Sequence, residues 1–153
     1  MNRRQSIKAL SAGFMAVLAT RTDLLADLAP QRMTVYKTPT CGCCDDWIKH
    51  VKAAGFDVVG INVDVVEPYK KKHGVPLDLA SCHTGVIGEY AFEGHVPADL
   101  IKRFLKSPPK GARGLAVPGM PAGSPGMEAG GRKDPYDVMV FDKAGKRSVY
   151  AKL

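Results

Sequence analysis

MTVYKTPTCGCCDDWIKHVKAAG, residues 33–55, is the stretch that decides the fold. Its opening MTVYK alternates apolar and polar side chains, which predicts a short strand. The following TPTCG combines proline and glycine, which predicts a turn. From Cys43 to Ala54 apolar side chains recur at helical spacing, and Gly55 then ends the helix. The sequence therefore predicts a strand, a cysteine-bearing turn and a helix.

Outward from this stretch, strands and helices alternate along the chain. In chain order we expect a strand at 56–63, a short basic helix at 67–73, a hairpin of strands 86–87 and 90–92, and a helix at 97–106. The resulting order, β-α-β-α-β-β-α, predicts an α/β fold with a partly parallel sheet. Because cysteines occupy its first strand-to-helix turn, this order resembles that of a thioredoxin-like domain.

The last third of the chain combines an irregular segment with a hairpin. Residues 111–131 are rich in glycine and proline, which predicts a loop without regular structure. Residues 137–141 and 147–151 flank a glycine-containing turn and predict a C-terminal β-hairpin. We therefore expect residues 33–153 to form a single thioredoxin-like domain with a Gly/Pro-rich loop and a terminal hairpin.

Length and composition exclude several classes of protein. The chain has 153 residues, a length suited to one domain. Apolar residues make up 45% and charged residues 24%, so the chain is globular and not intrinsically disordered. The net charge of +7 is spread along the sequence, and no dense basic run with interleaved aromatic residues occurs. We therefore expect no nucleic-acid partner.

Residues 1–29 have the pattern of an export signal. Arg3 and Arg4 precede the apolar stretch 9–19, which is too short to span a bilayer. The adjacent arginines resemble a twin-arginine signal, although Ser6 stands where such signals usually carry a bulky apolar residue. An amphipathic helix packed on the domain is the alternative. We expect a periplasmic protein with no transmembrane segment in its mature chain.

The four cysteines carry the chemical information. Cys41, Cys43 and Cys44 share one tight segment that contains both C-x-x-C, a redox-pair spacing, and C-x-C, a metal-binding spacing. The exposed N–H groups at a helix start stabilise anions and lower thiol pKa values, so this position favours thiolates. Cys82 precedes the third strand, which in a thioredoxin-like sheet lies beside the first. We therefore expect the four sulfur atoms to converge.

Three interpretations suit four converging sulfurs. Two disulfides would be ordinary outside the cytoplasm, but adjacent Cys43 and Cys44 pair poorly and only Cys82 lies outside the turn. A single zinc is usually held by two separated C-x-x-C pairs, and the chain has one. Copper(I) is soft and prefers thiolates. Four copper(I) ions would neutralise four thiolates, and bridging sulfurs would give each ion two bonds, so a multinuclear cluster balances charge and valence.

Histidines and methionines near these motifs are candidates for a secondary role. His83 follows Cys82, and His95 precedes the third helix, so each could bind metal or hydrogen-bond to a ligand. Met120 and Met127 lie between glycine and proline turns in the irregular segment, and their thioethers are soft ligands for copper(I). Filling apolar gaps is the alternative role for both methionines.

The motifs together resemble one family. They are VYKTPTCGCC (35–44), SCHT (81–84), EGHVP (93–97), GLAVPGMP (114–121) and GSPGME (123–128). Over about residues 33–153 the chain closely resembles the CopG-like periplasmic copper-resistance proteins, long catalogued as a domain of unknown function. The resemblance implies a thioredoxin-like fold and copper binding through the CxCC turn and Cys82. It also implies handling of copper outside the cytoplasm, by binding it or by interconverting its oxidation states.

The expected function is therefore that of a periplasmic copper-binding resistance protein that holds several copper(I) ions. Its partners would be copper ions and other periplasmic copper-handling proteins. The sequence leaves open whether the chain turns over copper as an oxidoreductase. Two alternative functions also fit the sequence: a thiol–disulfide oxidoreductase that uses Cys41 and Cys44, and a zinc-stabilised interaction module.

Overall fold

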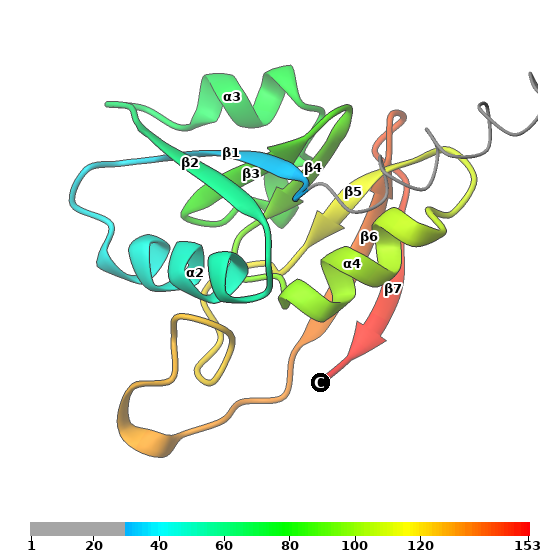
Figure 1. Cartoon of the computed structure of the whole chain (residues 1–153). Coiled ribbons are helices and arrows are strands. Elements are labelled where there is room, and N and C mark those ends of the chain that lie inside the picture. The colour runs from blue at the N-terminus through cyan, green and yellow to red at the C-terminus, as the bar shows by residue number, and fades with distance from the viewer. Residues whose placement is uncertain (1–29) are drawn as a thin grey trace, which may run out of the picture. The chain divides into compact units, whose positions relative to one another are not determined.

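The computed structural model describes residues 30–153 (Figure 1). The expected export signal, residues 1–29, lies outside the described residues. Within 30–153 no helix is both long and apolar enough to cross a membrane. The elements in chain order are β1 (Arg32–Lys37), α2 (Gly42–Ala53), β2 (Asp57–Asn62), α3 (Glu67–Lys72), a 3₁₀ turn (Leu77–Leu79), β3 (His83–Ile87), β4 (Tyr90–Glu93), α4 (Ala98–Lys106), β5 (Ala112–Ala116), a second 3₁₀ turn (Ala129–Gly131), β6 (Asp137–Asp142) and β7 (Arg147–Lys152).

The strands form one mixed sheet in the order β2-β1-β3-β4-β5-β6-β7. The pairs β1–β2 and β4–β5 are parallel, and the other neighbouring pairs are antiparallel. The predicted α/β class with a partly parallel sheet is confirmed. The predicted C-terminal hairpin is also confirmed, as the antiparallel pair β6–β7.

Helices cover both faces of this sheet. Figure 1 shows α2 and α4 on one side and α3 on the other. Trp47 and Val51 of α2 and Phe104 of α4 are fully buried in one apolar cluster with the sheet. Their spacing along each helix places apolar side chains on a single stripe, which is why both helices pack on the sheet. A smaller cluster that includes Leu79 and Phe141 forms a second core.

One sequence prediction was wrong in part. Residues 111–131 were expected to lack regular structure, but Ala112–Ala116 form β5, parallel to β4. Gly114 is needed within this strand because a Cβ at its position would lie 1.8 Å from the carbonyl oxygen of Ala91. The glycine thus permits a close approach of two backbones instead of marking a loop.

The register of β1 and β3 positions the cysteines. The two strands are antiparallel, and Lys37 at the end of β1 lies opposite His83 at the start of β3. The turn that follows β1 therefore lies beside the residue that precedes β3. This confirms the expectation that the start of the third strand approaches the cysteine turn.

Candidate metal centre

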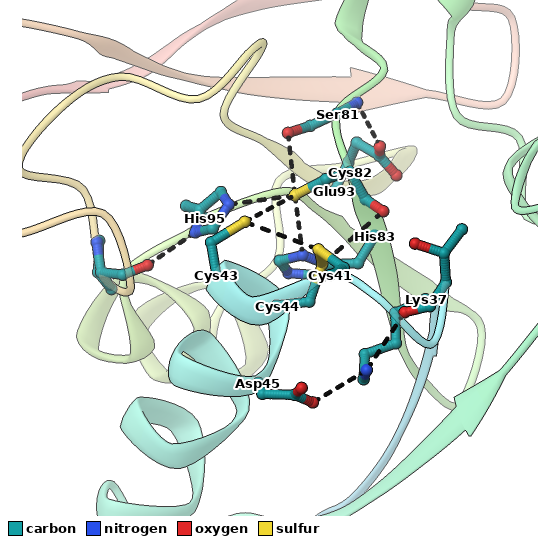
Figure 2. Close-up of a disulfide and its surroundings, with 12 residues drawn as sticks. Lys37, Cys41, Cys43, Cys44, Asp45, Ser81, Cys82, His83, Glu93 and His95 are labelled. Carbon is teal, nitrogen blue, oxygen red and sulfur yellow. Dashed lines mark hydrogen bonds and ion pairs between the residues drawn. A yellow bond between two sulfur atoms is a disulfide. The ribbon is translucent and has the colours of Figure 1, made fainter.

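The cysteine turn is built at the N-terminus of α2. Cys41 is the residue that caps this helix, and Cys43 and Cys44 lie in its first turn. Cys41 and Cys44 form a disulfide with their Cα atoms 5.3 Å apart, drawn in Figure 2, whereas Cys43 and Cys82 are free. The C-x-x-C spacing allows this bridge because one helical turn separates the two residues.

The four sulfur atoms converge as the sequence predicted. All of them lie within 4.8 Å of one another, and we call the set Cys41, Cys43, Cys44 and Cys82 the sulfur group. The Sγ of Cys43 is 3.6 Å from that of Cys41 and 4.0 Å from that of Cys82. Distances of this order suit sulfurs that share metal ions. The arrangement can therefore act as a dithiol–disulfide pair or as a cradle for a soft cation.

Two histidines adjoin the sulfur group through Cys82. The Sγ of Cys82 lies 3.4 Å from Nδ1 of His83 and 3.1 Å from Nε2 of His95. Nδ1 of His95 lies 2.8 Å from the carbonyl oxygen of Pro125, which can only accept, so this nitrogen carries the proton. Both rings are fully buried. The structure thus brings both sequence-predicted histidines to Cys82.

Burial keeps these groups uncharged in the disulfide-bonded protein. Desolvation, with the neighbouring Cys43, raises the pKa of Cys82 to about 12. Burial likewise lowers the pKa of His83, to which His95 and Lys70 also contribute, and the pKa of His95. A protonated thiol beside two neutral imidazoles therefore forms the inner part of the site. The thiolate character expected at the helix start does not extend to Cys82 before a cation binds.

A buried ion pair fixes the segment that carries Cys82. Nζ of Lys70 lies 2.5 Å from a carboxylate oxygen of Glu93, and both side chains are almost completely buried. Glu93 also accepts hydrogen bonds from the backbone N–H of Ser81, at 2.6 Å, and from the hydroxyl of Thr84, at 2.7 Å. Ser81 and Thr84 flank the Cys82–His83 pair. The carboxylate therefore holds the chain on both sides of the site.

Sequence reasoning did not assign roles to the charged residues that support the site. Lys37 is buried, donates to the carbonyl of Thr38 and pairs with Asp45 of α2 at 3.0 Å, so it ties the cysteine turn to the helix (Figure 2). Its position offered one signal: it continues the inward-facing set begun by Met33 and Val35. Nothing in the sequence indicated the pairing of Lys70 with Glu93.

The irregular segment after β5 lies against the site. The hydroxyl of Ser81 donates to the carbonyl of Gly119, and a Cβ on Gly126 would lie 2.8 Å from the backbone oxygen of Cys43. Gly119 and Gly126 are the sequence neighbours of Met120 and Met127. The backbone beside both methionines therefore lies close to the two cysteine-bearing segments. The side chain of Met120 is 55% exposed, and that of Met127 is half-buried.

One protein family and two solved structures match the chain. A family model described as "Protein of unknown function, DUF411" matches residues 79–127. Two solved structures, of forms 2 and 1 of copper resistance protein CopG, are similar to the chain. Each is 44% identical to it with a TM-score of 0.76, and each match covers 81% of this chain and 98% of the solved one. No curated protein matches the chain.

Proposed function

The chain belongs to the CopG copper-resistance family, and from this premise we propose that it holds copper(I) in the sulfur group as part of copper resistance and homeostasis. The observation that carries the proposal is the convergence of four cysteine sulfurs within 4.8 Å of one another. Thiolate is the protein ligand that copper(I) prefers, since both are soft. Copper is thus the cargo of the site.

Charge and valence favour several ions over one. Four thiolates carry four negative charges, and a single copper(I) would leave three of them unbalanced in a partly buried site, which is costly. Four copper(I) ions neutralise the group. If each sulfur bridges two ions, every copper gains two bonds. A bridged multinuclear cluster is therefore the proposed form of the loaded site, with Cys41, Cys43, Cys44 and Cys82 as ligands.

Loading of this cluster depends on the redox state of the cysteines. The disulfide between Cys41 and Cys44 withdraws two of the four ligands. Two copper(II) ions that each take one electron from the Cys41 and Cys44 thiolates would become two copper(I) ions, and the thiolates would form the disulfide. An external dithiol would restore the Cys41 and Cys44 thiols by thiol–disulfide exchange: it gives up two electrons and two protons to the disulfide and becomes a disulfide itself. Redox interconversion of copper is thus an extension of the same proposal.

The finer assignments of fold and location belong to this proposal. The strand order β2-β1-β3-β4, with α2 directly after β1, supports a thioredoxin-like domain over residues 33–153. The paired arginines at residues 3 and 4 support twin-arginine export to the periplasm. The partners would be copper ions and other periplasmic copper-handling proteins.

A second candidate function has one observation in its favour. Cys41 and Cys44 are joined at the N-terminus of α2, as the pair of a thiol–disulfide oxidoreductase would be. This candidate predicts that the metal-free protein reduces insulin disulfides in the presence of a reductant. The copper proposal requires no such activity.

The test of the copper proposal is metal content measured in both thiol states. Protein purified from export-competent cells is analysed for copper and zinc, then stripped and titrated with copper(I) in its reduced and disulfide-bonded forms. We expect copper in the isolated protein, several copper(I) ions per reduced chain, and weak copper(I) binding after oxidation, because the disulfide removes two ligands. Zinc in place of copper, or equal copper(I) binding by both forms, would contradict the proposal.

The two methionines are expected to contribute less than the cysteines. Met120→Ala and Met127→Ala should each weaken copper retention, because both residues lie in the loop whose Gly119 and Gly126 contact the cysteine-bearing segments, where a thioether can add a soft ligand or shield the cluster from water. Both lie outside regular elements, so the loss of folding free energy should be about 1 kcal/mol or less. Copper(I) competition with a chelator, together with urea unfolding, measures the two effects. Unchanged copper affinity in the double variant would assign the methionines to packing alone.

A further inference from the structure

We propose that two copies of the chain associate through the free edges of their β2 strands, which pair antiparallel about a two-fold axis at Gly60. β2 is the outermost strand on its side of the sheet, and among residues 30–153 it pairs with β1 alone. An edge strand presents unpaired backbone N–H and C=O groups, to which another strand can bind. The proposed partner is therefore a second copy of this chain.

The hydrogen bonds of β2 show which backbone groups are free. The N–H groups of Asp57 and Val63, at the two ends of the strand, donate to carbonyls of the β1 segment. Along a strand the backbone groups of successive residues point alternately to its two sides. The N–H and C=O groups of Val58, Gly60 and Asn62 therefore point away from β1, toward the open side.

The side chains of β2 divide between the two faces of the sheet. Val58 is buried in the main core, and a Cβ on Gly60 would lie 3.3 Å from Cδ1 of Ile48, so these positions face α2. Val59 and Ile61 therefore project from the opposite face. They are 44% and 40% exposed, respectively, although both are large and apolar. These two side chains form the apolar part of the interface.

Backbone and side chains select the same register. With Gly60 opposite its own copy, Val58 lies opposite the partner subunit's Asn62, and the outward N–H and C=O groups of each such pair bond to each other. In this register Val59 lies opposite the partner subunit's Ile61. These are non-hydrogen-bonded positions, which bring side chains closest together. Each exposed apolar side chain thus gains an apolar neighbour.

Other registers fit less well. A shift by one residue pairs outward backbone groups with inward ones. A shift by two residues either places Ile61 opposite the charged side chain of Asp57 or carries the pairing past Asn62, where the strand ends. In the proposed register Asp57, the one charged residue of β2, lies opposite Val63, so no like charges meet.

The other edge of the sheet is protected against such pairing. β7 begins with Arg147 and ends with Lys152, charges that an antiparallel copy would bring together, and its register with β6 is irregular. Charged residues and irregular pairing are the features that keep edge strands from associating. β2 contains no lysine, arginine or proline, and its register with β1 is unbroken. The contrast assigns association to β2.

The first test is sedimentation equilibrium of the full chain over a wide range of concentrations. We expect a reversible monomer–dimer equilibrium, which Val59→Lys/Ile61→Lys should weaken about tenfold or more by placing lysine opposite lysine. Val149→Lys, at an equally exposed valine of β7, is the matched control and should leave association unchanged. No cysteine lies in the paired segment, so the reduced double variant should retain copper(I) as the wild type does. That readout separates this inference from the proposed function.

Mixed variants test the register. Val59→Lys and Ile61→Asp proteins in equal amounts should form heterodimers in preference to homodimers, because lysine then lies opposite aspartate and the remaining valine opposite isoleucine. Val59→Lys mixed with Val59→Asp should show little preference, since position 59 does not lie opposite itself. Native mass spectrometry distinguishes these species by mass. Equal preference in both mixtures would contradict the register at Gly60.

Amide hydrogen exchange tests the backbone. On concentration, the N–H groups of Val58, Gly60 and Asn62 should exchange more slowly, whereas those of Val59 and Ile61 point toward β1 and should not change. A monomer at every concentration, or a dimer that survives in the double lysine variant, would overturn the inference. So would slow exchange of the outward amides at every concentration, because another segment of the same chain would then cover the edge.

Discussion

Cys82→Ser is expected to remove more than about a quarter of the copper(I) that the reduced protein retains, because bridging sulfurs are shared between ions. Cys82 is the one cysteine outside the turn, and its Sγ lies 4.0 Å from that of Cys43. Its loss opens the cluster on the side of β3. Copper per chain after desalting measures the effect. The corresponding serine variants at Cys41, Cys43 and Cys44 should each show a comparable loss.

Two comparisons make this result interpretable. Ser148→Ala, an exposed change on β7, should retain the full amount of copper. In the reduced wild type, copper(I) should protect cysteines from alkylation, which mass spectrometry counts, since bound sulfur is not free to react. A Cys82→Ser protein with wild-type copper content would refute the four-sulfur site. So would four labelled cysteines in the wild type both with and without copper(I).

The sequence was sufficient to predict the convergence of the cysteines because local rules govern it. Alternating polarity defined β1, helical spacing defined α2, and the adjacency of first and third strands then placed Cys82 at the turn. It did not settle which cysteines are bonded. Spacing alone allowed two disulfides, one disulfide or none, and the structure has the single Cys41–Cys44 bridge with Cys43 and Cys82 free.

The missed strand β5 shows where local rules fail. Glycine and proline usually mark loops, so residues 112–116 were expected to be irregular. Gly114 instead meets the carbonyl of Ala91 at a distance that no side chain would allow. That contact is made with a strand more than twenty residues earlier in the chain, and single-sequence patterns do not carry such information.

The support of the site was also invisible in the sequence. Lys70 lies in the basic stretch EPYKKK, where lysines are ordinarily exposed, and yet it is 2% exposed in the fold. Its partner Glu93 is 23 positions away. Only tertiary packing places a carboxylate between Ser81 and Thr84, so the fixation of Cys82 depends on a contact that composition and periodicity do not reveal.

Lys70→Met is expected to give the largest loss of stability, about 3–5 kcal/mol of the free energy of unfolding. The substitution leaves the carboxylate of Glu93 fully buried without its counter-charge, and the methionine offers no donor in return. Urea unfolding followed by circular dichroism measures the change. Because Glu93 holds the backbone of Ser81, copper(I) retention should fall together with stability.

The double variant Lys70→Met/Glu93→Gln separates the buried charge from the missing contact. Glutamine keeps an acceptor for the N–H of Ser81 and carries no charge, so the double variant should be more stable than Lys70→Met alone.

Lys49→Met breaks the exposed pair with Asp46 and is the matched control, for which the urea midpoint should stay close to that of the wild type. If Lys70→Met unfolds at the same urea concentration as Lys49→Met, the ion pair does not hold the segment around Cys82. The buried lysine is then not needed to compensate the charge of Glu93. The geometry of the sulfur group must instead be maintained by the remaining contacts of Ser81 and His95 with the loop after β5.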